Sequence, residues 1–285
     1  MSSEQPGPEI LRYTAFAAAP GGGNPAGVVL DTGAMTDAEM LAVARRVAYP
    51  ETAFVVGRTP AGVHLRYFSP AAEVPFCGHA TVATAVALAE RDGVGTSVVT
   101  TAAGEVPLVT TLDEDGAVQV AMTSVEPSVR PLAPELRERL FALLGLVDED
   151  VAPGFPVLES SAGNRHPVVV LADEDLFHQF RFDPARLADL KREAGWAGTV
   201  TVLHRTGGLE FEARNLFPVG RITEDPATGS AAAATGAYLR EVGAVSAGDR
   251  VVIRQGRHVG RPSVLLVDVP ASGGITVRGG ATRIE

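Results

Sequence analysis

The sequence predicts an α+β protein with two pseudo-symmetric halves, each a curved, mostly antiparallel sheet or barrel around one central buried helix. Strand patterns dominate both halves of the 285-residue chain. Each half also contains one uncharged, helix-length segment of small and apolar residues, at 80–89 and at 230–239. A helix that is apolar on every face is a buried helix, and small side chains let the surrounding strands approach it closely.

The first half begins with a run of short strands around one amphipathic helix. Thr36 and Glu39 form a capping-box pattern, so a helix is expected from there to about residue 48. Asp115 and Gly116 are typical of a hairpin turn. The expected strands span 11–17, 27–30, 52–56, 63–68, 98–101, 106–112 and 117–122.

The second half repeats this pattern of strands and helices. Helices are expected at 134–146, at 184–194 and from 229 to just before 243. The expected strands span 167–171, 199–204, 210–215, 250–254, 263–269 and 274–277.

The repeated plan suggests a domain division. The Pro- and Ser-containing stretch 123–134 is the expected crossover. The predicted N-terminal half is therefore 1–123, with 275–285 as a candidate completion of it, and the C-terminal half is 124–274.

Composition excludes several classes of protein. The net charge of −10 repels phosphate backbones, so nucleic acid is not an expected partner, although a small anionic substrate is compatible with local donors in a pocket. A single cysteine fits a reducing compartment. Residues 1–9 lack the pattern of a signal peptide, and no apolar run reaches the length of a membrane helix. We expect a soluble, cytoplasmic protein without a membrane partner.

The two buried helices begin with unusual glycine-containing segments, at 75–81 and 224–231. The N-terminus of a helix presents unpaired amides and a partial positive charge, so two such termini facing each other would bind a carboxylate. The alternative is ordinary capping by Asp225, Thr228 or Ser230, with Cys77 as a buried space-filling residue.

These segments resemble the PhzF (phenazine-biosynthesis) family. The similar motifs are Glu51-Thr-Ala-Phe-Val, Phe76-Cys-Gly-His-Ala-Thr, Phe217-Pro-x-Gly, Glu224-Asp-Pro-Ala-Thr-Gly-Ser-Ala and the early Gly23-Asn-Pro-Ala-Gly-Val-Val. They occur in order over nearly the whole chain. The resemblance implies the diaminopimelate epimerase-like fold, an active site in the cleft between the halves, and a homodimer.

The resemblance also implies roles for individual residues. Glu51 resembles the proton-shuttling glutamate of the family, and His79 and Asp225 resemble its polar partners at the substrate. The residues that the resemblance places in substrate binding are Asn24, Gly78, Ala80, Gly229 and Ser230. No metal and no cofactor are implied.

The chemistry explains why a glutamate suits this position. One group must remove a proton from carbon and return it to another carbon on the same face, and burial adapts a carboxyl group to this task. His79 and Asp225 could hydrogen-bond the substrate or stabilise developing charge. Without the family match, Glu51 would be read as a solvated acid at a strand edge.

Cys77 departs from the pattern of related racemases, which use two cysteines, one at the head of each central helix. The chain has no second thiol, so racemisation by a cysteine pair is impossible. Cys77 could still assist Glu51, or it could be a buried inert thiol.

Other site types are less well supported. Gly21-Gly-Gly23-Asn-Pro-Ala26 matches the glycine spacing of a dinucleotide-binding motif. That motif must open a helix, whereas Pro25 and the expected strand after it do not fit a phosphate-binding turn. His79, Asp225 and Ser230 lack a nucleophile elbow. The histidines show no metal spacing, and His166 and His204 are expected to be structural or exposed; the six are His64, His79, His166, His178, His204 and His258.

The sequence therefore predicts a cofactor-independent isomerase that shifts a proton, or a double bond, on a small carboxylate or amino-acid-derived substrate in secondary metabolism. The alternatives are a racemase, epimerase or dehydratase that uses Cys77, and a non-catalytic ligand-binding protein. The sequence does not identify the substrate.

Overall fold

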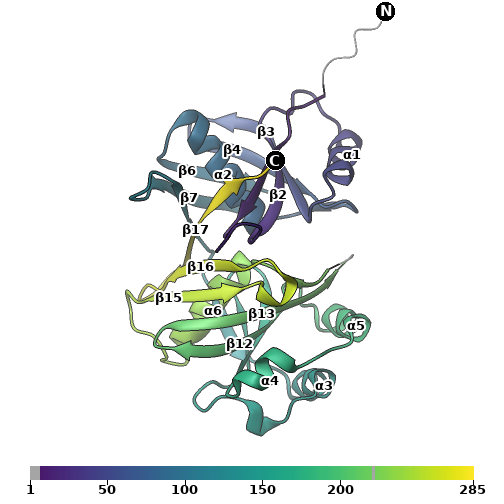
Figure 1. Ribbon diagram of the computed structural model, residues 1–285, viewed down its shortest axis with the longest axis vertical. Coiled ribbons are helices and arrows are strands. Elements are labelled where there is room, and N and C mark those ends of the chain that lie inside the picture. Colours follow the sequence, from purple (N-terminus) through teal and green to yellow (C-terminus); the bar gives the residue numbers. More distant parts are fainter. Residues whose placement is uncertain (1–6, 220–221) are drawn as a thin grey trace, which may run out of the picture. The chain divides into compact units, whose positions relative to one another are not determined.

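The computed structural model describes residues 7–219 and 222–285, which divide into two compact units (Figure 1). Of these residues, unit 1 contains 7–15, 25–122 and 279–285, and unit 2 contains 16–24, 123–219 and 222–278. Residues 16–24 were expected in the first half but belong to unit 2. The reason is hydrogen bonding, because the amides of Ala18 and Gly23 both donate to the Pro262 carbonyl.

Unit 1 is a closed barrel of eight strands in the order β1-β2-β3-β4-β6-β7-β8-β17, with β17 pairing again with β1. The closure leaves no free edge in the ring. The strands of the barrel, with the short β5 beside β4, are β1 (Leu11–Ala15), β2 (Asn24–Val29), β3 (Glu51–Thr59), β4 (Gly62–Phe68), β5 (Glu73–Val74), β6 (Thr96–Thr101), β7 (Gly104–Leu112), β8 (Val118–Thr123) and β17 (Thr276–Arg283).

The barrel of unit 1 encloses helix α2 (Gly78–Asp92). The helix contacts β1, β3 and β7, which are separated around the ring, so strands surround it. Ala80 and Ala83 have no exposed surface, and Thr81 and Thr84 satisfy their hydroxyls on the helix backbone. The small side chains of this segment thus allow the helix to fit inside, as the sequence predicted.

A second helix, α1 (Asp37–Val47), packs on the outside of β3 and β4. It has the predicted capping box, with the Glu39 amide donating to the Thr36 hydroxyl and the Thr36 amide donating to the Glu39 carboxylate. Its buried face meets Val29, Phe54 and Phe68 in a small separate core.

Unit 2 is a second mixed sheet, in the order β9-β10-β11-β12-β13-β15-β16-β17. The N-terminal residues of β17 belong to this sheet, and β14 pairs antiparallel with β13. The remaining strands are β9 (Ser128–Pro131), β10 (Leu158–Ser161), β11 (Arg165–Leu171), β12 (Val200–Gly207), β13 (Glu210–Val219), β14 (Ile222–Asp225), β15 (Arg250–Gln255) and β16 (Ser263–Asp268).

Helix α6 (Gly229–Glu241) packs against β9, β10, β11 and β16 and is buried over ten residues. The outer helices α3 (Pro134–Leu144), α4 (Glu174–Gln179) and α5 (Pro184–Ala194) form a separate hydrophobic cluster against β11, β12 and β13. Two short 3₁₀ turns complete the described elements, η1 (Asp148–Asp150) and η2 (Arg257–Val259).

Both units follow one topological plan. Parallel neighbours need a crossover connection, which is usually a helix. In unit 1 the parallel pairs are β2–β3, crossed by α1, and β4–β6, crossed by α2. In unit 2 they are β11–β12, crossed by α4 and α5, and β13–β15, crossed by α6. The pairs β1–β17, β3–β4, β6–β7, β7–β8, β9–β10, β10–β11, β12–β13, β15–β16 and β16–β17 are antiparallel. The predicted α+β class with two similar, mostly antiparallel halves is therefore confirmed.

Some elements differ from the sequence-based expectation. The expected crossover 123–134 contains β9, which pairs with β10, a strand that was not predicted. The strand expected over 11–17 ends at Ala15, because Phe16 has a φ of 63°. The turn at Asp115 and Gly116 is part of a wider loop, 113–117, in which Asp113 accepts from the Asp115 and Ala117 amides.

None of the helices in the described part of the chain is both long and apolar enough to span a membrane.

Candidate active site

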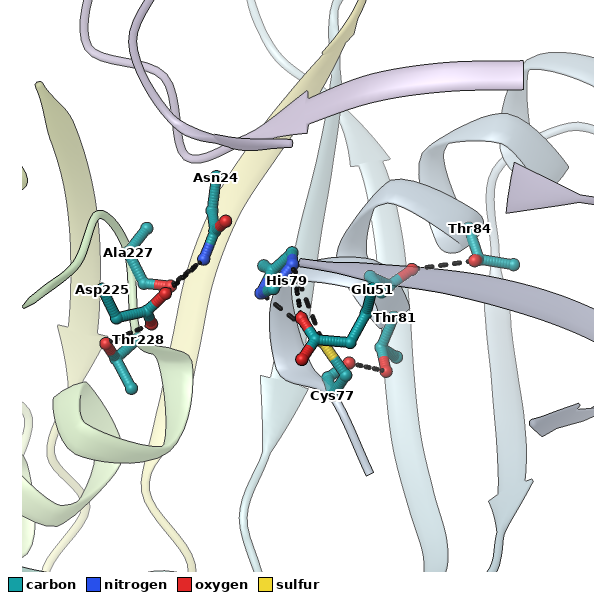
Figure 2. A network of polar contacts seen from close by, with 10 residues as sticks. Asn24, Glu51, Cys77, His79, Thr81, Thr84, Asp225, Ala227 and Thr228 are labelled. Carbon is teal, nitrogen blue, oxygen red and sulfur yellow. Dashed lines mark hydrogen bonds and ion pairs between the residues drawn. The ribbon is translucent and has the colours of Figure 1, made fainter. Parts of the chain in front are cut away.

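Three predicted residues meet at the head of α2 in unit 1 (Figure 2). Glu51 is the first residue of β3, Cys77 is the N-cap residue of α2, and His79 lies in the first turn of that helix. Residues far apart in the chain meet here because β3 packs against the enclosed helix. The cluster is largely buried, since the Glu51 side chain is 20% exposed and that of His79 is 7% exposed.

The carboxylate of Glu51 lies against both neighbours. Its Oε2 is 3.5 Å from Cys77 Sγ, which donates to it, and 3.3 Å from His79 Nε2. The thiol also lies 3.4 Å from His79 Nδ1. A carboxylate, a thiol and an imidazole in mutual contact form a site for moving protons.

Burial keeps the His79 ring neutral at physiological pH. Desolvation lowers the pKa of His79 to about 3, and a hydrogen bond to the Pro25 backbone opposes the shift without overcoming it. The contact with Glu51 therefore joins a carboxylate to a neutral ring rather than to a cation. A neutral imidazole has one donor and one acceptor nitrogen, and both are useful in proton transfer.

The same three side chains also form a donor set for a metal ion. Their ligand atoms all lie within 4.8 Å of one another. Sulfur and imidazole ligands would favour a borderline-soft ion such as Zn²⁺. The sequence-based expectation of a metal-free site stays a prediction.

Asp225, the last residue of β14 in unit 2, is at the centre of a second polar cluster (Figure 2). Its carboxylate accepts from Asn24 Nδ2 at 2.8 Å and from Thr228 Oγ1 at 2.6 Å. Asn24 Nδ2 also donates to the Ala227 carbonyl, and Gln255 Nε2 donates to the Asp225 backbone carbonyl. Asn24 thus joins the predicted Asp225 as part of one network in unit 2.

The environment of Asp225 favours its protonated form. Desolvation raises the pKa of Asp225 to about 6, although the hydrogen bonds from Thr228 and Asn24 and the charge of Lys191 act in the opposite direction. A carboxyl group with this pKa can exchange a proton near physiological pH.

Ser230, in the first turn of α6, has a partner that the sequence reading set aside as structural or exposed. His166 is fully buried, and its Nε2 lies 3.2 Å from Ser230 Oγ. His166 Nδ1 lies 3.0 Å from the Thr199 amide nitrogen and 3.1 Å from the Thr199 carbonyl oxygen. The tautomer of the ring therefore sets whether Nε2 donates to Ser230 Oγ or accepts from it. His166 is buried rather than exposed, because it is the second residue of β11, and the apolar run that follows it in the sequence was the available signal.

The N-cap residues of the two buried helices do not cap them with their side chains, although the Thr228 amide at the head of α6 donates to Gln255 Oε1. Neither Cys77 at α2 nor Thr228 at α6 makes a side-chain capping bond, whereas Thr36, Asp173 and Asp183 cap the outer helices α1, α4 and α5. Thr228, one of the three expected capping residues, therefore does not cap α6 with its side chain. Gly78 and Gly229 begin these helices, whereas Ala80 has no exposed surface with which to contact a ligand.

Lys191 is a further candidate that the sequence reading missed. Its side chain is buried on α5, and its Nζ has no hydrogen-bond partner within the described ranges and lies 4.1 Å from the Phe217 ring centroid. Desolvation lowers its pKa to about 8, and the charge of Asp225 opposes this shift. The available signal was spacing, because Lys191 stands four residues after Leu187 on the apolar face of α5.

The chain is similar in sequence to a known protein family and to proteins named as isomerases. The sequence model of a family described as phenazine biosynthesis-like proteins matches residues 13–285. The Bacillus subtilis (strain 168) protein called uncharacterized isomerase YfhB is 32% identical over 273 residues, which cover 93% of this chain and 92% of that protein. The trans-2,3-dihydro-3-hydroxyanthranilate isomerase of Pseudomonas fluorescens is 29% identical over 254 residues, covering 88% of this chain and 86% of its own.

Solved structures agree with the fold. The crystal structure of a Bacillus anthracis phenazine biosynthesis protein of the PhzF family superposes with a TM-score of 0.82 at 26% identity. The match covers 97% of this chain and 96% of that one. The fold expected from the motifs is therefore confirmed over nearly the whole chain.

Proposed function

Because the chain belongs to the phenazine biosynthesis-like (PhzF) family and is an isomerase, we propose that it shifts a proton on a small carboxylate or amino-acid-derived substrate, with Glu51 as the acid–base residue. One observation carries the proposal. The Glu51 carboxylate lies at the uncapped head of α2, within 3.5 Å of a thiol and of a neutral imidazole, and keeps 20% of its side chain exposed.

The proposed reaction needs only one base. The Glu51 carboxylate takes a proton from a carbon atom, and the electron pair of the broken C–H bond enters the π-system of the substrate. The protonated Glu51 then returns the proton to another carbon of that system. No atom or electron is gained or lost overall, so the step needs no co-reactant.

The neighbours of Glu51 have supporting roles in this proposal. His79 hydrogen-bonds the substrate as a neutral group, because burial disfavours its cationic form. The amides of the first turn of α2 stabilise negative charge that develops on the substrate. Asp225 and Ser230 are the corresponding polar groups at the head of α6. The prediction that both helix heads serve one substrate stays a prediction.

A second candidate function is proton exchange at one carbon, as in an epimerase, with Cys77 as a second acid–base group. The contact that favours it is the 3.4 Å separation between Cys77 Sγ and His79 Nδ1. A thiol next to an imidazole at a helix N-terminus is a common form of reactive cysteine. The expected secondary-metabolic role, cytoplasmic location and homodimer stay predictions from the resemblance.

The test is deuterium incorporation in heavy water, followed by NMR. The protein is incubated with unsaturated carboxylic and amino acids, including the compound for which the P. fluorescens relative is named. Glu51→Gln keeps the shape but removes the base, so we expect turnover to fall by about 100-fold or more. Cys77→Ser should retain most of the activity.

Glu105→Gln is the matched control, because Glu105 is exposed on β7 and its loss removes the same charge. Full activity in Glu51→Gln would contradict the proposal. Loss of labelling in Cys77→Ser alone would favour the epimerase, and binding without labelling of any compound would favour a ligand-binding protein.

A further inference from the structure

Two histidines that are far apart in the sequence meet in unit 2. His178 on α4 and His258 in η2 bring Nδ1 and Nε2 to within 3.1 Å of each other. Glu212 on β13 lies beside them, and the ligand atoms of the three residues are all within 4.8 Å of one another. The sequence showed no metal spacing because the three come from separate elements of the fold.

Glu212 supplies an independent observation. Its Oε1 is buried and has no hydrogen-bond partner among the residues that the structure describes. Among the described residues, the only ion pair of Glu212 is with Arg257. The Arg257 Nη1 atom is 3.7 Å from Glu212 Oε1, beyond hydrogen-bond distance, and the Arg257 side chain is 70% exposed. Burying a carboxylate oxygen without a hydrogen bond costs folding free energy. A bound cation would remove this cost, so the oxygen is a candidate metal ligand.

A carboxylate lies near the other side of the His178 ring. Nε2 of His178 is 3.6 Å from Glu174 Oε1, one helical turn earlier on α4, which is beyond hydrogen-bond distance. Histidines that bind metals usually direct their second nitrogen to a carboxylate or carbonyl, which orients the ring. The Phe177 ring packs edge-on against both imidazoles, with centroids 5.2 Å from His178 and 5.6 Å from His258.

We propose that His178, His258 and Glu212 form a binding site for Zn²⁺. Two imidazoles and one carboxylate are a donor set that suits this ion, and water can complete the coordination. Ligands about 2.0–2.1 Å from zinc lie roughly 3.3 Å apart in a tetrahedron, which is close to the observed 3.1 Å between the histidines. The Glu212 carboxylate contributes an oxygen within 4.8 Å of both ring nitrogens.

The local charges permit a cation. Two arginines, Arg214 and Arg257, lie near His258. Arg214 is itself paired with Glu224 through two hydrogen bonds, which offsets its charge. The Arg257 side chain is exposed and can turn toward solvent. A bound ion would join α4 and η2 to β13 and stabilise unit 2.

The test is a calorimetric titration of the metal-stripped protein with ZnCl₂ near neutral pH. All proteins carry Cys77→Ser, which removes the thiol from the Glu51, Cys77 and His79 donor set. We expect one equivalent of Zn²⁺ to bind, and His258→Ala and Glu212→Gln to weaken it by about tenfold or more. His64→Ala is the matched control, since His64 is exposed on β4 of unit 1, and it should bind like the parent.

Thermal unfolding provides a second readout. Zn²⁺ should raise the unfolding temperature of the parent and of His64→Ala but not that of His258→Ala, and MgCl₂ should not replace it. Absence of stoichiometric binding, or equal affinity in His258→Ala and His64→Ala, would overturn the proposal.

If His258→Ala fails to fold, NMR of the parent protein tests whether Zn²⁺ binds at this site. Zn²⁺ should then move the ring signals of His178 and His258 and leave His64 unchanged. Unchanged signals of His178 and His258 would reject the site.

Discussion

Glu51 lies against a thiol and against an imidazole that burial keeps neutral. Because His79 carries no charge near neutral pH, this contact does not lock the carboxylate into an ion pair. The Glu51 carboxylate can then take a proton from the substrate and return it, as an acid–base residue must.

Asp225 gives a prediction at the same scale, through the pH dependence of stability. Its pKa is raised from 3.8 to about 6, so the folded state binds the proton more tightly than the unfolded state does. The resulting stability is fully present below about pH 4 and is lost as the pH rises through about 6. Asp225→Asn mimics the protonated form, so wild type should lose about 2–3 kcal/mol relative to this variant between about pH 4 and 7.

The measurement is denaturant unfolding of both proteins across this pH range. Asp115→Asn, in the exposed hairpin loop, is the control and should follow wild type. A constant difference between wild type and Asp225→Asn would show that Asp225 has an ordinary pKa in the folded protein.

Single residues were predictable where a motif marked them. Glu51, Cys77 and His79 were named from the sequence and lie in one cluster, as do Asn24 and Asp225. Their catalytic and binding roles stay predictions. His166 and Lys191 were not identified, because a histidine before a strand and a lysine on a helix are usually solvated. Only the fold shows that both are buried.

Among the elements, the buried helices depend on small residues at close contacts. Gly236 of α6 lies against β16, and a Cβ atom there would be 2.7 Å from Val267 Cγ1 and 2.9 Å from Ile275 Cγ2. Glycine in a helix normally costs about 1 kcal/mol relative to alanine. Its presence here is explained by packing, which leaves no room for a methyl group.

Gly236→Ala should therefore destabilise the protein in spite of the better helix propensity of alanine. Overpacking costs roughly 1–3 kcal/mol, so we expect the unfolding temperature to fall by about 2–6 °C in differential scanning calorimetry. Gly95→Ala is the control, since no atom lies within 4 Å of a Cβ at that position. An unchanged or higher unfolding temperature for Gly236→Ala would mean that β16 moves away at little cost.

The long elements followed from periodicity, and the short ones did not. Helices α1, α2, α5 and α6 lie close to their predicted ranges. Strand β9 is short and mostly exposed, and β14 has only four residues, so neither shows an alternating pattern. Such strands form because they pair with a neighbouring strand. The sequence of the short strand does not show which strand that is, and only the tertiary fold does.

At the scale of the whole molecule, unit 1 depends on a strand from the other end of the sequence. The end of β17 pairs with β1, with Ala281 opposite Ala15, and β17 also pairs with β8. It is therefore an interior strand of the closed ring although it is the last strand in the sequence.

Ala281→Pro should open this ring. Proline cannot donate to the ladder and is not tolerated in interior strands. We expect the unfolding temperature to fall by roughly 5 °C or more, with aggregation through the exposed strand edges. Glu285→Pro is the matched control, because Glu285 is exposed beyond the end of β17. Wild-type stability of Ala281→Pro would show that the ring tolerates a missing bond at this strand.

This closure also sets the order in which the protein can be made. A ribosome releases β1 to β8 first, but these strands cannot close into a barrel until β17 has emerged. The strands β9 to β16 of unit 2 are translated in the meantime, so the part of the chain that is synthesised first is completed last. During that interval β1 and β8 have unpaired edges, at which the incomplete chain is prone to pair with other strands and aggregate.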